Sequence, residues 1–140
     1  MRPALAALAC LALAAALPAA ADDFKVVVHP ENPAGEVTAS QLSRLFLKKA
    51  LRWEDGTAAQ PVEPATPRLR EQFALTVHDR SVNAVRAYWN QMIFSGRDVP
   101  PIEKPGDAEV IAYVRTNRGA VGYVSAGADV AGLKVLAVRR

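Results

Sequence analysis

Short β-branched segments alternate with longer amphipathic segments along this chain, and that alternation is the strongest restriction on its fold. Residues 24–28, FKVVV, have the composition of a buried strand. We predict two final strands at residues 120–124 and 133–138. Residues 60–64, QPVEP, form a short strand at best, because proline limits ladder pairing on both sides. Strands that alternate with helices indicate an α/β fold with a mostly parallel or mixed central sheet flanked by helices.

Two helices are predicted before residue 80. Thr38 and Gln41 have capping-box spacing for a helix over about residues 39–50, with Lys48 and Lys49 in its last turn, where cations suit the helix dipole. Thr66 followed by Pro67 marks the start of a second helix that runs to about residue 78. The residues expected to face the core are Leu42, Leu45, Phe46, Leu69, Phe73, and Leu75 or Val77.

Two more helices are predicted after residue 80. Ser81 caps the third, which Gly96 ends, and Asp107 caps the fourth, which ends near Asn117. The residues expected to face the core are Val82, Val85, Trp89, Met92, Ile93, Val110, Ile111 and Val114. Residues 29–37 and 96–107 are interpreted as irregular connections.

The first 21 residues have the pattern of a secretory signal peptide. Arg2 precedes an apolar run over residues 4–17, and Pro18 and residues 19–21 supply the break and the small residues of a cleavage site before Asp22. The apolar run is too short and too rich in alanine to span a bilayer. We therefore expect one domain over residues 22–140, in the periplasm or secreted, with no stable membrane insertion after cleavage.

The composition of the predicted mature chain excludes several classes of protein. The only cysteine, Cys10, lies in the signal segment, so packing alone must hold the domain. The formal net charge, +3 for the full sequence and +2 once Arg2 is removed, is spread along the chain without a basic run, so no nucleic-acid partner is expected. His29 and His78 lie far apart and give no metal-binding spacing. Nucleophile elbows and phosphate-binding loops are absent as well, so we expect no enzyme and no cofactor.

Several short motifs occur in a characteristic order. They are the Phe-x-x-Lys pattern of residues 46–49, the Trp-x-x-Gly turn of residues 53–56, the Pro-Val pair of residues 61–62, and VGYV at residues 121–124. Together with REQF at residues 70–73 they resemble the phosphate-binding proteins of ABC transporters, which are two-lobed periplasmic binding proteins of type II. The resemblance implies that residues 24–138 form one lobe and that Trp53 is a packing residue of its turn.

The resemblance also implies an anion site at a helix start. The family holds phosphate with a Ser-Gly-Thr-Arg segment, which aligns with residues 67–70 here. Arg70 keeps the pattern, but Pro67 removes an N–H donor and Leu69 removes a hydroxyl. We therefore predict an anion site of Thr66, Arg68 and Arg70, although the Thr66 hydroxyl, as a helix cap, is expected to bond the helix's own N–H groups. The lobe that supplies the family's other phosphate contacts is not in this sequence.

Two functions remain open at this point. The first is an exported, non-catalytic protein like the substrate-binding proteins of phosphate ABC transporters, which binds phosphate or another small anion and has a transporter or other envelope protein as its partner. The alternative is an envelope scaffold or interaction protein that keeps the lobe without binding a ligand. Neighbouring transporter genes would favour the first function, and neighbouring envelope sensor or secretion genes would favour the second.

Overall fold

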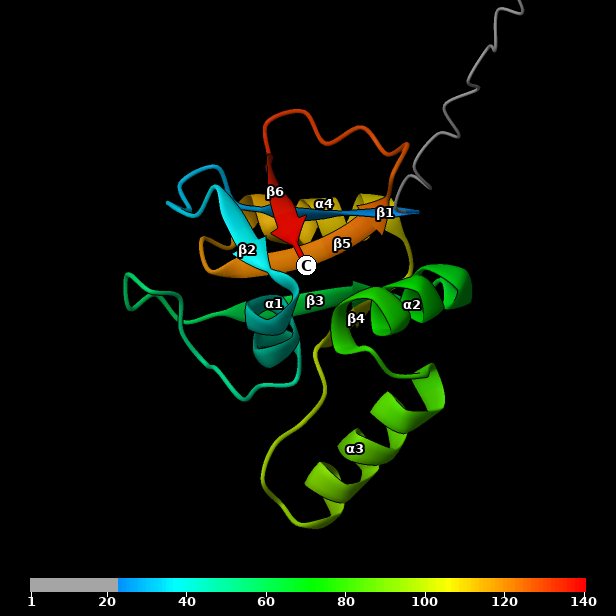
Figure 1. The fold of residues 1–140 in the computed structure, drawn as a ribbon. Helices are drawn as coiled ribbons and strands as arrows, with labels where there is room; N and C mark the ends of the chain where they lie inside the picture. The colour runs from blue at the N-terminus through cyan, green and yellow to red at the C-terminus, as the bar shows by residue number, and fades with distance from the viewer. Residues whose placement is uncertain (1–22) are drawn as a thin grey trace, which may run out of the picture.

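The computed structural model describes residues 23–140, which form a sheet covered by helices (Figure 1). The predicted signal peptide and its cleavage site lie outside the described residues. Among the helices of residues 23–140, none combines the length and the apolar character that a membrane span requires.

The sheet is mixed and has six strands in the order β2-β6-β1-β5-β3-β4. β1 pairs antiparallel with both β5 and β6, whereas β3 is parallel to β5 and β4, and β2 is parallel to β6. The predicted α/β class with a mixed central sheet is confirmed. The strands are β1 Phe24–Val28, β2 Glu36–Thr38, β3 Gln60–Pro64, β4 Ile102–Lys104, β5 Ala120–Ser125 and β6 Lys134–Arg139.

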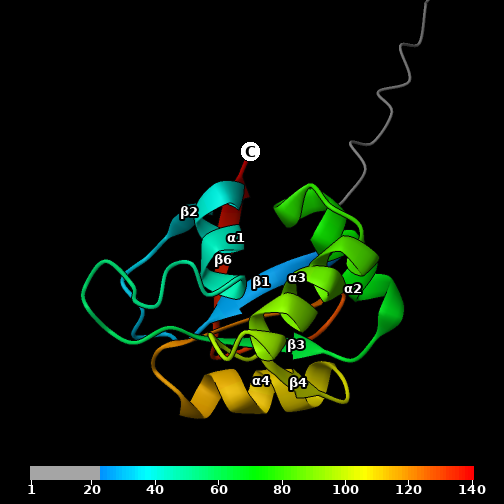
Figure 2. The same ribbon diagram turned by 90° about the horizontal axis from the view of Figure 1, so that it is seen from below.

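Helices lie on both faces of the sheet. The helices are α1 Ala39–Phe46, α2 Pro67–Phe73, α3 Val82–Phe94 and α4 Asp107–Thr116, and a π-helical turn, η1 Ala74–His78, continues α2. α4 covers one face, and α1 and α2 cover the other (Figure 2). The alternation of side chains along β1 serves both layers, because Val26 and Val28 face the core under α1 and α2 while Val27 faces the core under α4.

Aromatic rings fill the core under α1 and α2. The rings of Phe73 and Tyr123 are stacked with centroids 4.0 Å apart, and Phe46 lies 4.7 Å from Phe73. Phe24 meets Phe73 edge-on at 5.4 Å. Rings of this size dominate the burial that stabilises a small domain. They fix α2 firmly on the sheet and thereby fix the position of the segment that precedes it.

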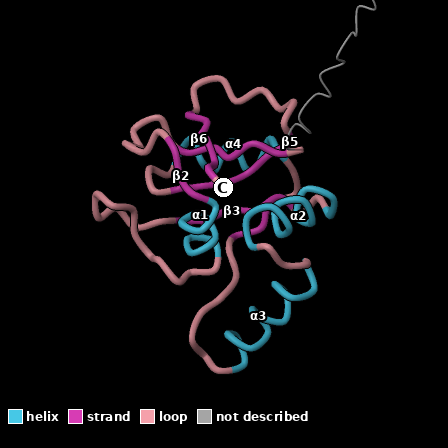
Figure 3. Tube along the Cα trace, viewed as in Figure 1, coloured by secondary structure: helices cyan, strands magenta, loops and turns pink. Residues whose placement is uncertain are grey.

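The first helix ends earlier than predicted. The capping box of Thr38 and Gln41 is confirmed, with both hydrogen bonds at 3.0 Å, but α1 stops at Phe46. Lys48 has a φ of 54°, a left-handed conformation that an α-helix does not continue through. Lys48 and Lys49 therefore lie in the loop of residues 47–59 (Figure 3), where Lys48 pairs with Asp98 at 3.5 Å.

β3 is a short strand whose prolines limit its pairing on both sides, as predicted, although it lies in the interior of the sheet. Each proline has a partner in only one neighbouring strand. Pro61 pairs with β5 and precedes the β4 register, which starts at Val62. Pro64 pairs with β4 and lies beyond the β5 register, which ends at Val62. The N–H groups that the two prolines lack would therefore have had no partner in either ladder.

Both segments interpreted as irregular connections contain a strand. Glu36–Thr38 forms β2 and Ile102–Lys104 forms β4, and each has only three residues at an edge of the sheet. The predicted cap of α4 was also wrong. Gly106 occupies the N-cap position, and Asp107 is the first helical residue. Its Oδ1 accepts from the backbone N–H of Ser125 at 3.0 Å and so ties the helix start to the end of β5.

The third helix forms as predicted but is only partly covered. The Ser81 cap is confirmed by a 3.1 Å bond from the Ala84 N–H, and Gly96 follows the helix end with a φ of 68°. Trp89 is buried, as predicted, whereas Ile93 is 51% exposed and Phe94 is 95% exposed. The other positions expected on that face, Val82, Val85 and Met92, are half-buried. In Figure 1 α3 extends away from the sheet, which leaves the end of this face in solvent.

Candidate functional site

The predicted anion site lies where β3 passes into α2. The expected helix is present from Pro67 to His78, as α2 and its continuation η1, with Leu69, Phe73 and Val77 buried and Leu75 turned to solvent. The buried residues position the start of the helix at the carboxyl end of β3, where side chains of an α/β sheet commonly gather into a site. Thr66, Arg68 and Arg70 all lie on this connection.

Thr66 and Arg68 are both on the surface. Thr66 is the N-cap residue, but its side chain makes no capping hydrogen bond, so the expectation that its hydroxyl is used by the helix was wrong. The side chain of Arg68 is 79% exposed, and its Nη2 lies 3.4 Å from Oδ2 of Asp23. An exposed pair of this kind contributes little to stability. Both residues remain open to solvent.

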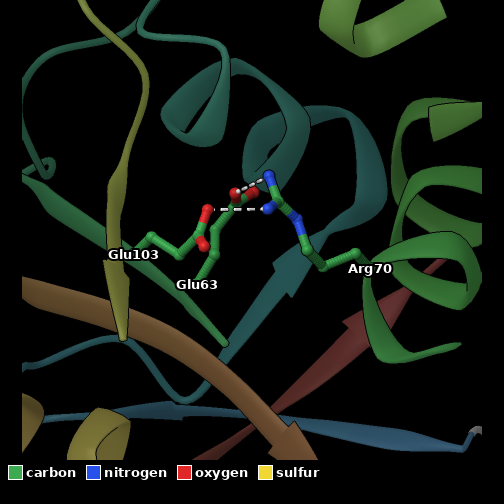
Figure 4. A network of polar contacts seen from close by, with 3 residues as sticks. All are labelled: Glu63, Arg70 and Glu103. Carbon is green, nitrogen blue, oxygen red and sulfur yellow. Dashed lines mark hydrogen bonds and ion pairs between the residues drawn. The ribbon is translucent and has the colours of Figure 1, made fainter. Parts of the chain in front are cut away.

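Arg70 is held by two carboxylates. Its Nη2 donates to Oε2 of Glu63 at 3.0 Å, and its Nη1 donates to Oε2 of Glu103 at 2.8 Å (Figure 4). Glu63 comes from β3 and Glu103 from β4, so the guanidinium of α2 joins two parallel strands. The two guanidinium nitrogens that would chelate an oxyanion are therefore occupied by groups of the chain itself.

The three charges form a network with an excess of negative charge. Burial raises the pKa of Glu63 to about 7, the Arg70 guanidinium opposes that rise, and the Glu103 carboxylate adds to it. Burial, followed by the charge of Glu63, also raises the pKa of the nearby Tyr123 phenol. A cavity of about 250 Å³ adjoins the network beneath α3, with Trp89, Arg86 and Asn90 in its wall. Two carboxylates against one guanidinium are a poor match for a phosphate dianion.

Sequence reasoning found Arg70 but missed its two partners. Glu63 carried one usable signal, because a carboxylate inside an apolar strand requires a charged partner when it is buried. Glu103 carried no such signal, since the segment around it is interpreted from sequence as a loop. Trp53 packs against the aromatic core, and its Nε1 donates to the carbonyl of Gly119 at 2.9 Å, as the packing interpretation of this turn predicted.

The described residues present no metal centre. Within residues 23–140, histidine, cysteine and carboxylate side chains nowhere gather in a group of three that could hold a metal ion. His78 lies apart from the Arg70 network in its hydrogen bonding, with its Nδ1 2.7 Å from the Ser43 hydroxyl. Burial, reinforced by the charges of Arg80 and Lys49, lowers the pKa of His78 to about 4, so this imidazole is neutral at pH 7.

The chain matches a known family profile and is similar in structure to solved proteins. The family profile described as "PBP superfamily domain" matches residues 12–138. No curated protein matches the chain. An ABC-type phosphate transport receptor from Vibrio cholerae is similar in structure, with a TM-score of 0.61 and 20% identity over 84% of this chain and 46% of the receptor. PstS from Borrelia burgdorferi is similar with a TM-score of 0.63 and 13% identity, over 84% of this chain and 47% of that protein. This chain thus spans less than half the length of either.

Proposed function

The chain belongs to the PBP superfamily domain family, and on that premise we propose that it is an exported, non-catalytic binding protein, related to the substrate-binding proteins of phosphate ABC transporters. Its fold is that of the lobe it shares with the phosphate transport receptor and PstS. In this proposal the protein is periplasmic or secreted, and a transporter or other envelope protein is its partner. An intact mass that begins at Asp22 in the periplasmic fraction would support export, and a full-length cytoplasmic protein would contradict it.

The occupied guanidinium of Arg70 is the observation that decides the strength of phosphate binding. Phosphate at Thr66, Arg68 and Arg70 would have to displace Glu63 or Glu103 from a pair that is already made. Such a ligand would also lack the enclosing cleft that a high-affinity small-molecule site normally provides. We therefore propose that these three residues form a weak anion site and that the chain alone is not a high-affinity phosphate receptor.

A thermal-shift titration with phosphate tests this proposal. We expect 10 mM phosphate, a concentration that would saturate a micromolar site, to raise the melting temperature by only about 1–2 °C. Glu103→Gln is the informative variant, because Glu103 is more than half exposed and its loss frees one side of Arg70 for an anion. Phosphate should stabilise Glu103→Gln more than it stabilises the wild type.

The matched control is Glu109→Gln, which removes one exposed carboxylate from α4, on the opposite face of the sheet. It should respond to phosphate as the wild type does. A wild-type shift of about 10 °C that Arg70→Gln abolishes would show instead that this lobe is a phosphate receptor in its own right.

A second candidate function is supported by the uncovered end of α3. Phe94 and Ile93 on the helix and Val99 in the following loop are all more than half exposed, an unusual grouping for the surface of a monomer. An interaction protein that docks an envelope partner there would need no ligand. A photo-crosslinking residue at position 94, but not at position 109, should then give a defined adduct in cells, and equal labelling from both positions would remove this candidate.

A further inference from the structure

A groove of about 710 Å³ lies between α1 and the end of η1, away from the Arg70 network. α1 and the α2–η1 segment lie side by side on one face of the sheet (Figure 2). The volume falls within the usual range of small-molecule sites. One wall is α1, and the other is the turn of residues 75–80 that ends the π-helical segment.

Cations outnumber anions among the residues that line the groove. Arg44 comes from α1, Lys49 from the following loop and Arg80 from the turn after η1, and Arg140 lines the groove as well. Asp79 is the acidic side chain among the residues that line it. Like charges gathered around one hollow raise the local potential and concentrate anions there.

Two of these arginines differ from most other arginines of the described chain. Within residues 23–140, Arg68, Arg70, Arg118 and Arg139 all have carboxylate partners. The side chains of Arg44 and Arg80 have no hydrogen bond or ion pair with any described residue, and both are exposed. Arg97 is similarly without a partner but lies outside the groove. Arg44 and Arg80 thus bring two uncommitted guanidinium forks to opposite walls of one groove.

The uncharged groups of the groove also suit an oxyanion. Ser40, Ser43 and Thr76 bring hydroxyls to the same hollow, and hydroxyls donate to phosphate oxygens. His78 borders the groove beside Ser43, with 2.7 Å between its Nδ1 and the Ser43 hydroxyl. Tetrahedral phosphate groups present several acceptor oxygens each and match both guanidinium forks and hydroxyls.

We propose that this groove is a binding site for a small soluble ligand with two or more phosphate groups, held between Arg44 and Arg80. Each guanidinium fork can take one phosphate group, and linked phosphate groups would satisfy both forks at once. The site is distinct from Thr66, Arg68 and Arg70, so this inference does not depend on how strongly those residues bind an anion.

Isothermal titration calorimetry with inorganic tripolyphosphate at low ionic strength tests the site. We expect tripolyphosphate to bind about tenfold or more tightly than orthophosphate. The double variant Arg44→Gln/Arg80→Gln should weaken tripolyphosphate binding by about tenfold for each arginine, the effect of losing a charge-assisted hydrogen bond. Both side chains are exposed, and circular dichroism would verify that the variant is folded.

A matched double variant, Arg97→Gln/Arg118→Gln, removes the same number of charges. Arg97 has no partner among the described residues and the side chain of Arg118 is 62% exposed, and both lie outside the groove, so this control should bind tripolyphosphate like the wild type. The proposal is overturned if the wild type does not bind tripolyphosphate, if orthophosphate binds equally well, or if the control weakens binding as much as the Arg44→Gln/Arg80→Gln variant. Sedimentation with phosphatidylglycerol vesicles separates the ligand sources, and binding to vesicles alone would also overturn it.

Discussion

The arginines at the two ends of the α2–η1 segment differ in whether carboxylates of the chain already bind them. At its start, Arg70 lies between two carboxylates and joins β3 to β4. At its end, Arg80 faces a groove with no carboxylate partner among the described residues. Arginine therefore links two strands at the start of the segment, whereas at its end it carries a charge without a carboxylate partner among the described residues. An arginine that matches a family motif indicates a ligand site only where the fold has not already neutralised it.

The largest expected effect on stability comes from α3, the helix that covers the Arg70 network. Trp89 borders the cavity next to Glu63, and it is the one residue of α3 that is buried. Trp89→Ala should lower the free energy of unfolding by about 3–5 kcal/mol, the usual cost of deleting a large buried aromatic. Denaturant unfolding at constant m-value measures this. A loss below about 1 kcal/mol would mean that α3 does not cover the network and that the two arginine environments are more alike than described.

Removal of each arginine should separate the two environments directly. Arg70→Ala leaves Glu63 buried without its cation, and we expect a loss of about 2–3 kcal/mol at pH 8. This lies below the usual 3–5 kcal/mol for a broken buried pair, because the side chain of Arg70 is one-third exposed. Arg80→Ala should change stability by less than about 0.5 kcal/mol. Equal losses in chemical denaturation would contradict the distinction.

The pH dependence of stability sharpens the comparison further. Because the pKa of Glu63 is raised from 4.5 to about 7, the folded state retains a proton that the unfolded state has lost between these pH values. The contribution of Glu63 therefore falls as pH rises from about 4.5 to about 7, by on the order of 2 kcal/mol. His78, whose pKa is lowered to about 4, acts in the opposite sense between pH 4 and 6.5.

A comparison of the stability of the wild type with that of Glu63→Gln separates the contribution of Glu63 from that of His78. Glu63→Gln keeps the shape of the side chain and cannot titrate. The stability of the wild type relative to Glu63→Gln should decline from pH 5 to pH 7.5, as measured by urea unfolding. Parallel curves for the two proteins would show that Glu63 titrates normally and that Arg70 is not confined as the structure indicates.

Local patterns predicted the elements well, and the reasons for the misses are physical. The capping box of α1, the Thr66-Pro67 helix start and the FKVVV strand all depend on neighbouring residues. β4 depends on pairing with residues 40 positions earlier in the sequence, and the bond from Arg70 to Glu103 joins residues 33 apart, and no short pattern records either. For α3, periodicity predicted an apolar face correctly, but burial of that face requires a surface opposite it, and for Phe94 the fold supplies none.

The place of β1 in the sheet has a consequence for when the protein can fold. β1 begins at Phe24, yet both of its neighbours, β5 and β6, lie beyond residue 119. A ribosome releases the amino-terminal strand long before its partners appear, and closing so long a loop is slow. The centre of the sheet, where β1 lies between β5 and β6, can therefore form only once nearly the whole chain has been synthesised.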